Sequence, residues 1–150
     1  MTVSDIDYLK KILLAPVYDV AVNSDLVLLS RLTAELGNEV FLKREDQQPV
    51  KSFKLRGAYN RIANLTEAQL NAGVVAASAG NHAQGVAYSA NMKGVKATIV
   101  MPETTPDIKI EAVRRFGGQH VNIVLHGTNF GTASQHARTI SAEHGYTLIP

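Results

Sequence analysis

The chain has 150 residues, of which 45% are hydrophobic and 19% charged, and its formal net charge is +2. This length suits one compact domain with a buried core, and the composition excludes a disordered chain. The small, dispersed charge gives no reason to expect nucleic acid or a membrane surface as a partner. Because the chain contains no cysteine, disulfides and thiolate metal sites are excluded. The acidic start also lacks an apolar signal core, so we expect a cytoplasmic protein.

The first third of the sequence predicts two helices and one strand. Apolar residues at helical spacing predict a helix over residues 5–15 that ends before Pro16. Leucines at the same spacing predict a second helix over residues 25–36, with Gly37 as its terminator. The run Val-Phe-Leu at 40–42 predicts a strand.

A charged run, Lys43-Arg44-Glu45-Asp46, follows this strand. Glu45 and Asp46 are adjacent and would point apart on a strand, which argues against a paired acid/base role. We interpret Arg44 with Glu45 as a structural ion pair.

From residue 74 onward, short apolar runs alternate with helical patterns. Strands are predicted at 74–77, 97–100, 121–125 and 146–149. Helices are predicted over 81–93 before Gly94, from Thr105 and Pro106 as cap and first residue to Gly117-Gly118, and over 129–144, with Phe130, Ala133, Ala137 and Ile140 inward. This alternation indicates successive βαβ units with right-handed crossovers. The predicted fold class is therefore α/β, an open and mostly parallel sheet with helices on both faces.

Lys54 occupies an unusual position for a lysine. Ser52 can cap a helix over residues 52–64, so that Phe53 and Lys54 fall in its first turn. An apolar stripe follows at Leu55, Ala58, Tyr59 and Ile62. The helix dipole and the bordering stripe both favour the neutral amine, a nucleophile that can form a Schiff base with a carbonyl. Residue type alone favours a solvated or anion-binding lysine instead.

The second informative segment is Ser78-Ala79-Gly80-Asn81-His82-Ala83-Gln84-Gly85, between a predicted strand and a predicted helix. A turn of small residues at a helix start aims unpaired backbone N–H groups at one point, which can bind a carboxylate or phosphate. Ser78 adds a hydroxyl and Asn81 an amide. An ordinary turn with Asn81 as helix cap explains the segment equally well, and it matches neither the dinucleotide glycine spacing nor the P-loop.

Together, residues 52–58 and 78–85 closely resemble the threonine dehydratases, pyridoxal-phosphate enzymes of the tryptophan-synthase-β fold type. The run 14–18, Leu-Ala-Pro-Val-Tyr, is similar to the biosynthetic branch of that family. Further matches occur at Lys43 to Asp46, Val100-Met101-Pro102, Lys109 and Gly117-Gly118. The resemblance extends from about residue 8 to residue 150.

The resemblance implies a role for each matched residue. Lys54 would carry pyridoxal phosphate and take the Cα proton of threonine, beside Phe53. Asn81 would hydrogen-bond the cofactor ring hydroxyl. Ser78 and the backbone N–H groups of Ala79, Gly80, Asn81 and His82 would hold the substrate carboxylate. The implied products are 2-oxobutanoate and ammonia, on the route to isoleucine. Ala79 stands where related racemases carry a serine base, so elimination is favoured over racemisation.

Other expectations limit this interpretation. Residues 1–150 are expected to form one α/β unit, the N-terminal portion of a catalytic domain, without its second half, its glycine-rich phosphate loop or any regulatory domain. We therefore expect weak cofactor binding and negligible turnover. A non-catalytic remnant or binding module, and a serine dehydratase or racemase-like enzyme, stay open as alternatives, as does a homo-oligomer. His120, His126, His136 and His144 lack the spacing of a metal site, and none is expected.

Overall fold

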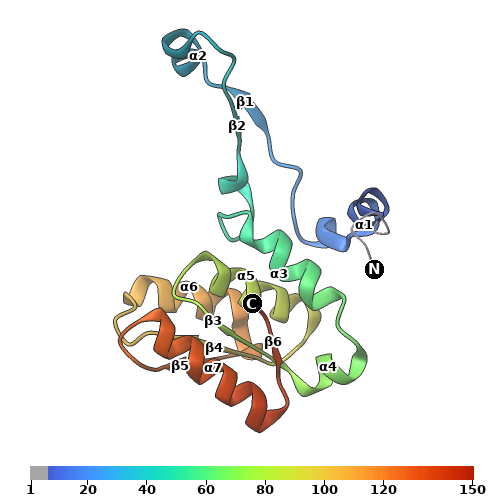
Figure 1. Ribbon diagram of the computed structural model, residues 1–150, viewed down its shortest axis with the longest axis vertical. Coiled ribbons are helices and arrows are strands. Elements are labelled where there is room, and N and C mark those ends of the chain that lie inside the picture. Colours follow the sequence, from blue (N-terminus) through green and yellow to red (C-terminus); the bar gives the residue numbers. More distant parts are fainter. Residues whose placement is uncertain (1–6) are drawn as a thin grey trace.

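The computed structural model describes residues 7–150, in which a long arm projects from a layered α/β body (Figure 1). Helix α1 spans Tyr8–Leu14 and buries none of its residues. It lies within the helix predicted over 5–15, of which residues 5 and 6 fall outside the described residues. The 3₁₀ helix η2, Pro16–Asp19, follows at once.

The arm is a two-stranded antiparallel ribbon with a short helix at its tip. Strand β1 (Leu26–Leu28) pairs with β2 (Phe41–Lys43), and α2 (Ser30–Leu36) lies between them (Figure 1). The predicted helix over 25–36 is therefore wrong in its first part, because the backbone of β1 bonds to β2 instead of to a helical turn. Gly37 does end the helix, in the left-handed conformation with φ 66°.

Four parallel strands form the central sheet, as predicted. They are β3 (Val74–Ala77), β4 (Ala97–Met101), β5 (Val121–Leu125) and β6 (Thr147–Leu148), in the order β5-β4-β3-β6. The register aligns Val74 with both Ala97 of β4 and Thr147 of β6. Strand β6 meets β3 over two residue pairs, whereas β4 and β5 share five.

Helices cover both faces of this sheet, which confirms the predicted fold class. Because successive strand residues point to opposite faces, Val74 and Ala76 pack in the core beneath α5 (Asn81–Lys93) and α6 (Asp107–Gly117). Val75 packs on the other face with Ala133, Ala137 and Ile140 of α7 (Phe130–His144). The glycine terminators predicted at 94 and 145 both adopt left-handed conformations.

Helix α3 (Lys54–Ala63) lies outside α5 and buries Leu55, Ala58, Tyr59 and Ile62, the predicted stripe. Its outer side contributes to a second cluster with Val20 and Val50. Helix α4 (Glu67–Ala72) follows and was not predicted, although Thr66 and Gln69 form a capping box that the sequence contains.

Further helix starts differ from expectation. Helix α3 begins at Lys54 and its cap is Phe53, not Ser52. Phe130 was predicted inward but is 62% exposed, because it is the first residue of α7 and precedes the buried stripe. Helix α6 begins at Asp107 after Pro106, so Thr105 does not cap it; the Thr105 hydroxyl is buried without a partner among the described residues. The cap of α5 is Gly80, not Asn81.

Candidate functional site

The order of the strands locates the site. The chain passes from β3 through α5 to β4 and then β5, but α7 carries it back to β6 on the other side of β3. Ligands of open α/β sheets bind at such a reversal, beyond the carboxyl ends of the strands. His82 follows β3 and Ile149 follows β6, so both lie at this point.

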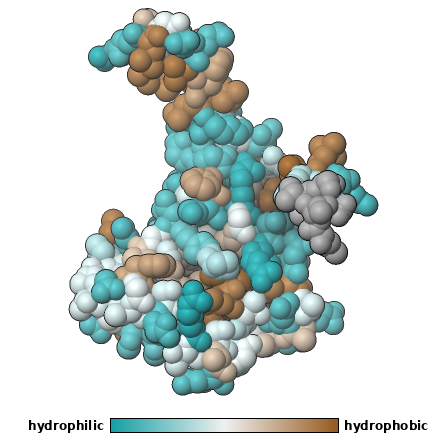
Figure 2. All heavy atoms as spheres, in the orientation of Figure 1, coloured by the Kyte–Doolittle hydropathy of each residue, from teal (hydrophilic) through white to brown (hydrophobic). Residues whose placement is uncertain are grey.

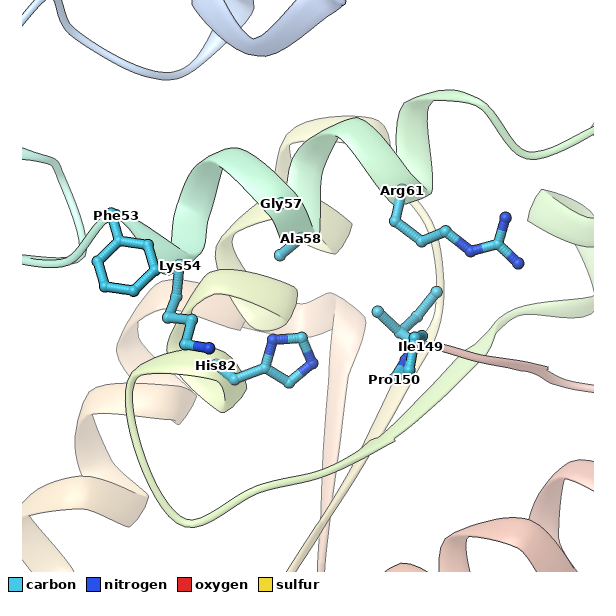
Figure 3. A pocket seen from close by; sticks show the side chains of 8 residues that line it. All are labelled: Phe53, Lys54, Gly57, Ala58, Arg61, His82, Ile149 and Pro150. Carbon is cyan, nitrogen blue, oxygen red and sulfur yellow. The ribbon is translucent and has the colours of Figure 1, made fainter. Parts of the chain in front are cut away.

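A pocket of about 310 Å³ opens there, between α3 and the carboxyl ends of β3 and β6 (Figure 3). Its lining residues are Phe53, Lys54, Gly57, Ala58, Arg61, His82, Ile149 and Pro150. Three of the residues predicted for a cofactor and substrate site, Phe53, Lys54 and His82, therefore meet in one cavity. Residues 61, 149 and 150 were not predicted to belong to it.

Lys54 is the first residue of α3, and the turn before it fixes its direction. The Ser52 hydroxyl accepts a hydrogen bond from the Lys54 backbone N–H at 3.2 Å. Lys54 Nζ lies 5.4 Å from the centroid of the Phe53 ring, a cation–π distance. The Lys54 side chain is exposed, however. The apolar stripe thus does not desolvate it as the sequence had suggested.

Gly85 determines how closely α5 approaches Lys54. A Cβ atom at Gly85 would lie 3.3 Å from the carbonyl carbon and oxygen of Lys54 and 3.4 Å from Cβ of Ala58. The two shortest contacts are with backbone, and none is with the end of a flexible side chain that could turn aside. A glycine at this position therefore lets the two helices that carry Lys54 and His82 pack directly on each other.

The turn between β3 and α5 contains the remaining predicted residues. The Gly80 N–H donates to the Ser78 hydroxyl at 3.2 Å, so the turn is held by its own side chain. Asn81 opens α5 and is exposed. The first N–H groups of a helix have no partner within it, so those of Asn81 and His82 stay available. Of the residues predicted in this turn, His82 lines the pocket. The other four, Ser78 to Asn81, immediately precede it in the sequence.

His82 is the titratable group most affected by burial in the pocket. Burial lowers its pKa, the nearby positive charge of Lys54 lowers it further, and the backbone carbonyl of Ile149 opposes both effects. The pKa is lowered overall, so the ring is neutral at neutral pH. Its Nε2 atom is buried and lacks a partner at normal hydrogen-bond geometry within residues 7–150.

A polar clasp anchors the arm to the helix of Lys54. Arg56 donates to Glu45 through Nε at 2.9 Å and Nη2 at 3.0 Å, and Ser24 donates to the same carboxylate at 2.6 Å. These bonds hold the pKa of Glu45 down at about 2. The fully buried Gln48 completes the clasp by bonding the backbone of Val22 in both directions.

The clasp corrects one sequence prediction. Arg44 pairs with Asp46 at 2.7 Å, not with Glu45, whose cation is Arg56. Glu45 and Asp46 do point to different partners.

Within residues 7–150, no three histidine, aspartate or glutamate side chains converge as metal ligands. Within the same residues, no helix combines the length and apolar character needed to cross a membrane.

The fold and the pocket define a class of protein. It is an open α/β unit in which a lysine amine and the start of a helix lie on opposite sides of a pocket, at the point where the strand order reverses. The family model described as "Pyridoxal-phosphate dependent enzyme" matches residues 17–150. The chain therefore belongs to the family of pyridoxal-phosphate-dependent enzymes.

Curated relatives refine this assignment. The chain is 54% identical over 143 residues to an L-threonine dehydratase biosynthetic IlvA from Burkholderia multivorans, with 95% of this chain covered. It is 52% identical over 144 residues to the protein of the same name from Escherichia coli, with 96% covered. The chain spans 28% and 27% of the length of these two relatives.

Solved structures agree with the sequence comparison. The processed form of threonine deaminase isoform 2 from Solanum lycopersicum matches with a TM-score of 0.89 and 52% identity, over 95% of this chain and 41% of that one. Maize serine racemase matches with a TM-score of 0.87 and 31% identity, over 97% of this chain and 43% of that one.

Proposed function

We propose that this chain supplies the lysine-bearing part of a site that converts L-threonine to 2-oxobutanoate and ammonia with pyridoxal phosphate. The observation that carries the proposal is the position of Lys54. This residue lines a pocket at the point where the strand order reverses, and it lies across the pocket from the start of α5. The names of the relatives, biosynthetic threonine dehydratases, support threonine as substrate and a role in isoleucine formation.

The residues present fit the cofactor. A Cβ atom added at Gly57 or Gly80 would meet nothing within 4 Å, so there is open room beside Lys54 and beside the turn before α5. The pocket is of the size that small cofactors use. A primary amine, an aromatic ring and a helix start therefore surround a space that a planar, anionic aldehyde can enter.

Each residue has a proposed task. Lys54 Nζ would hold the cofactor through its aldehyde group, and as a free amine it would take the Cα proton of the substrate. Phe53 packs beside the cofactor ring, and Asn81 donates to its hydroxyl. Ser78 and the backbone N–H groups of residues 79–82 hold the substrate carboxylate. Bound pyridoxal phosphate supplies an electron sink for bond cleavage at Cα.

Ala79 favours elimination over racemisation. A racemase needs an acid–base group on each face of the substrate Cα, and alanine has none. The likeness to maize serine racemase keeps serine chemistry as the second candidate. Release of oxo acid from L-threonine without formation of D-serine from L-serine supports the dehydratase, and D-serine formation would favour the alternative.

The test separates attachment of the cofactor from turnover, because the chain spans about 28% of its relatives' length. The protein is incubated with pyridoxal phosphate, reduced with borohydride and digested, and the modified lysine is located by mass spectrometry. We expect modification at Lys54, its loss in Lys54→Met and its retention in Lys93→Met, an exposed lysine at the end of α5. Modification spread evenly over surface lysines would support the non-catalytic alternative. Oxo-acid release from threonine is then measured on the same samples.

The proposal includes a cytoplasmic location, supported by the absence of cysteine from the sequence. It names an amino acid as the small-molecule partner. A homo-oligomer is supported by the exposed apolar arm, and light scattering during size-exclusion chromatography measures it.

A further inference from the structure

The pocket contains a second cation, Arg61, to which the proposed function gives no task. Arg61 lines the pocket from the last turn of α3, whereas Lys54 lines it as the first residue of the same helix (Figure 3). Seven residues are close to two turns of an α-helix, so the two residues share one face of α3 and lie about 10 Å apart along its axis. The pocket therefore has a cation near each end of this helix.

Small residues separate the two cations. Gly57 and Ala58 lie between Lys54 and Arg61 in α3, and both line the pocket. A Cβ atom added at Gly57 would meet nothing within 4 Å. Among residues 7–150, no side chain of another element therefore occupies the space beside Gly57. A ligand that reaches Lys54 can thus extend along α3 toward Arg61.

No acidic side chain balances these two charges within the pocket. The lining residues include Lys54 and Arg61 but neither aspartate nor glutamate. Four other arginines do pair with a carboxylate, namely Arg31, Arg44, Arg56 and Arg114. Arg61 forms no ion pair within residues 7–150. An anionic group of a ligand would therefore meet a guanidinium for which no carboxylate of the pocket competes.

The two cations suit different parts of one ligand. A neutral lysine amine adds to a carbonyl carbon and releases water, whereas a guanidinium stays charged and binds phosphate or carboxylate oxygens through two N–H groups. The last turn of a helix favours a cation even without a ligand. Lys93 has the same position on α5 and does not line this pocket, so it separates the two explanations.

We propose that Arg61 is a specificity residue of the pocket, which selects carbonyl compounds that carry a second, negatively charged group. Its guanidinium binds that group while the carbonyl carbon faces Lys54 Nζ. For pyridoxal phosphate the selected group is the phosphate, so the chain favours the phosphate ester over pyridoxal. This selection rests on the proposed function for the reaction at Lys54, whereas binding of the anion does not.

Binding of the anion is tested first, with inorganic phosphate. Phosphate is titrated at constant pH and low ionic strength into the wild type, Arg61→Met and Lys93→Met. The ring resonances of His82, identified by their loss in His82→Phe, are followed by NMR. We expect saturable shifts in the wild type and Lys93→Met, and binding about two- to fivefold weaker in Arg61→Met, the effect of one exposed ion pair. Equal losses in both variants, equal affinity in all three proteins, or no saturable shift in the wild type would overturn the proposal.

Selection is then tested by the rates at which two aldehydes modify Lys54. Each protein is incubated with pyridoxal phosphate or pyridoxal, reduced with borohydride and analysed by mass spectrometry. We expect the ratio of the two rates to fall about two- to fivefold in Arg61→Met and to stay at the wild-type value in Lys93→Met. High salt should reduce the difference, because it screens exposed charges. An unchanged ratio in Arg61→Met would refute the selection. If neither aldehyde modifies Lys54 in the wild type, the proposed function fails, while the phosphate titration still decides whether Arg61 binds the anion.

Discussion

Gly85 of α5 packs against the carbonyl group of Lys54, where a methyl group would lie 3.3 Å from the carbonyl carbon and oxygen, closer than ordinary van der Waals contact. Lys54 begins α3 and Gly85 lies within α5, so this contact sets the distance between the two helices that line the pocket. The glycine is thus a spacing element for the proposed catalytic lysine.

Two alanine substitutions measure the cost of that contact. Gly57→Ala, on α3 with nothing near its added methyl group, should stabilise the protein by about 0.5–1 kcal/mol through helix propensity. Gly85→Ala gains the same propensity but presses on the Lys54 backbone, so its stability gain should be smaller or absent. Urea denaturation of both variants provides the comparison. Equal stabilisation would mean that the helices separate without cost.

The Glu45–Arg56 clasp should make stability depend on acid pH. The pKa of Glu45 falls from 4.5 to about 2 on folding. A lowered pKa contributes stability that is present above about 4.5 and is lost as pH falls toward 2. Glu45→Gln should therefore be about 1–3 kcal/mol less stable than wild type at pH 7, and the difference should shrink across this window.

Asp46→Asn is the control for that experiment. Asp46 pairs with Arg44, and both side chains are well exposed, at 58% and 38%. Exposed pairs are screened by solvent, so this change should affect stability little at any pH. A loss as large as that of Glu45→Gln would show that a general charge effect, not the clasp, is responsible.

The arm should make the protein bind hydrophobic dyes. Leu26 and Phe41 are 63% and 51% exposed, and Figure 2 shows hydrophobic colour along the arm. Exposed apolar patches bind partners or promote aggregation. Replacing both residues by threonine, which retains strand propensity, should lower dye fluorescence and light scattering. Ile108→Thr, at an isolated residue that is 79% exposed on α6, should not.

Local sequence patterns predicted the layered body and the position of Lys54, but not the arm. The stripe from Leu55 to Ile62 and the strand at 74–77 each follow from neighbours in the sequence, which periodicity detects. Leu26 and Leu29 belong to a run of leucines at helical spacing. Residues 26–28 nevertheless form a strand because they pair with residues 41–43, and a local pattern does not contain that pairing.

The same limit applies to the site. The sequence paired Glu45 with its neighbour Arg44, whereas the true cation is Arg56, eleven residues away on another element. Gly85 was noted as part of a turn, and its contact with Lys54 depends on how two helices cross. Ile149 lines the pocket because β6 returns beside β3, and Arg61 lines it from the second half of α3.

One wall of the pocket rests on the shortest strand of the sheet. Strand β6 meets β3 through two residue pairs, and Ile149 adds one bond to Val75 at 2.8 Å. Local openings of a native protein begin where such bonds are few. The amides of β6 should therefore exchange with deuterium well before those of β3 and β4. The pocket would then open by fraying of one edge strand while the rest of the sheet stays folded, and a ligand that bridges Lys54 and Ile149 would slow that exchange.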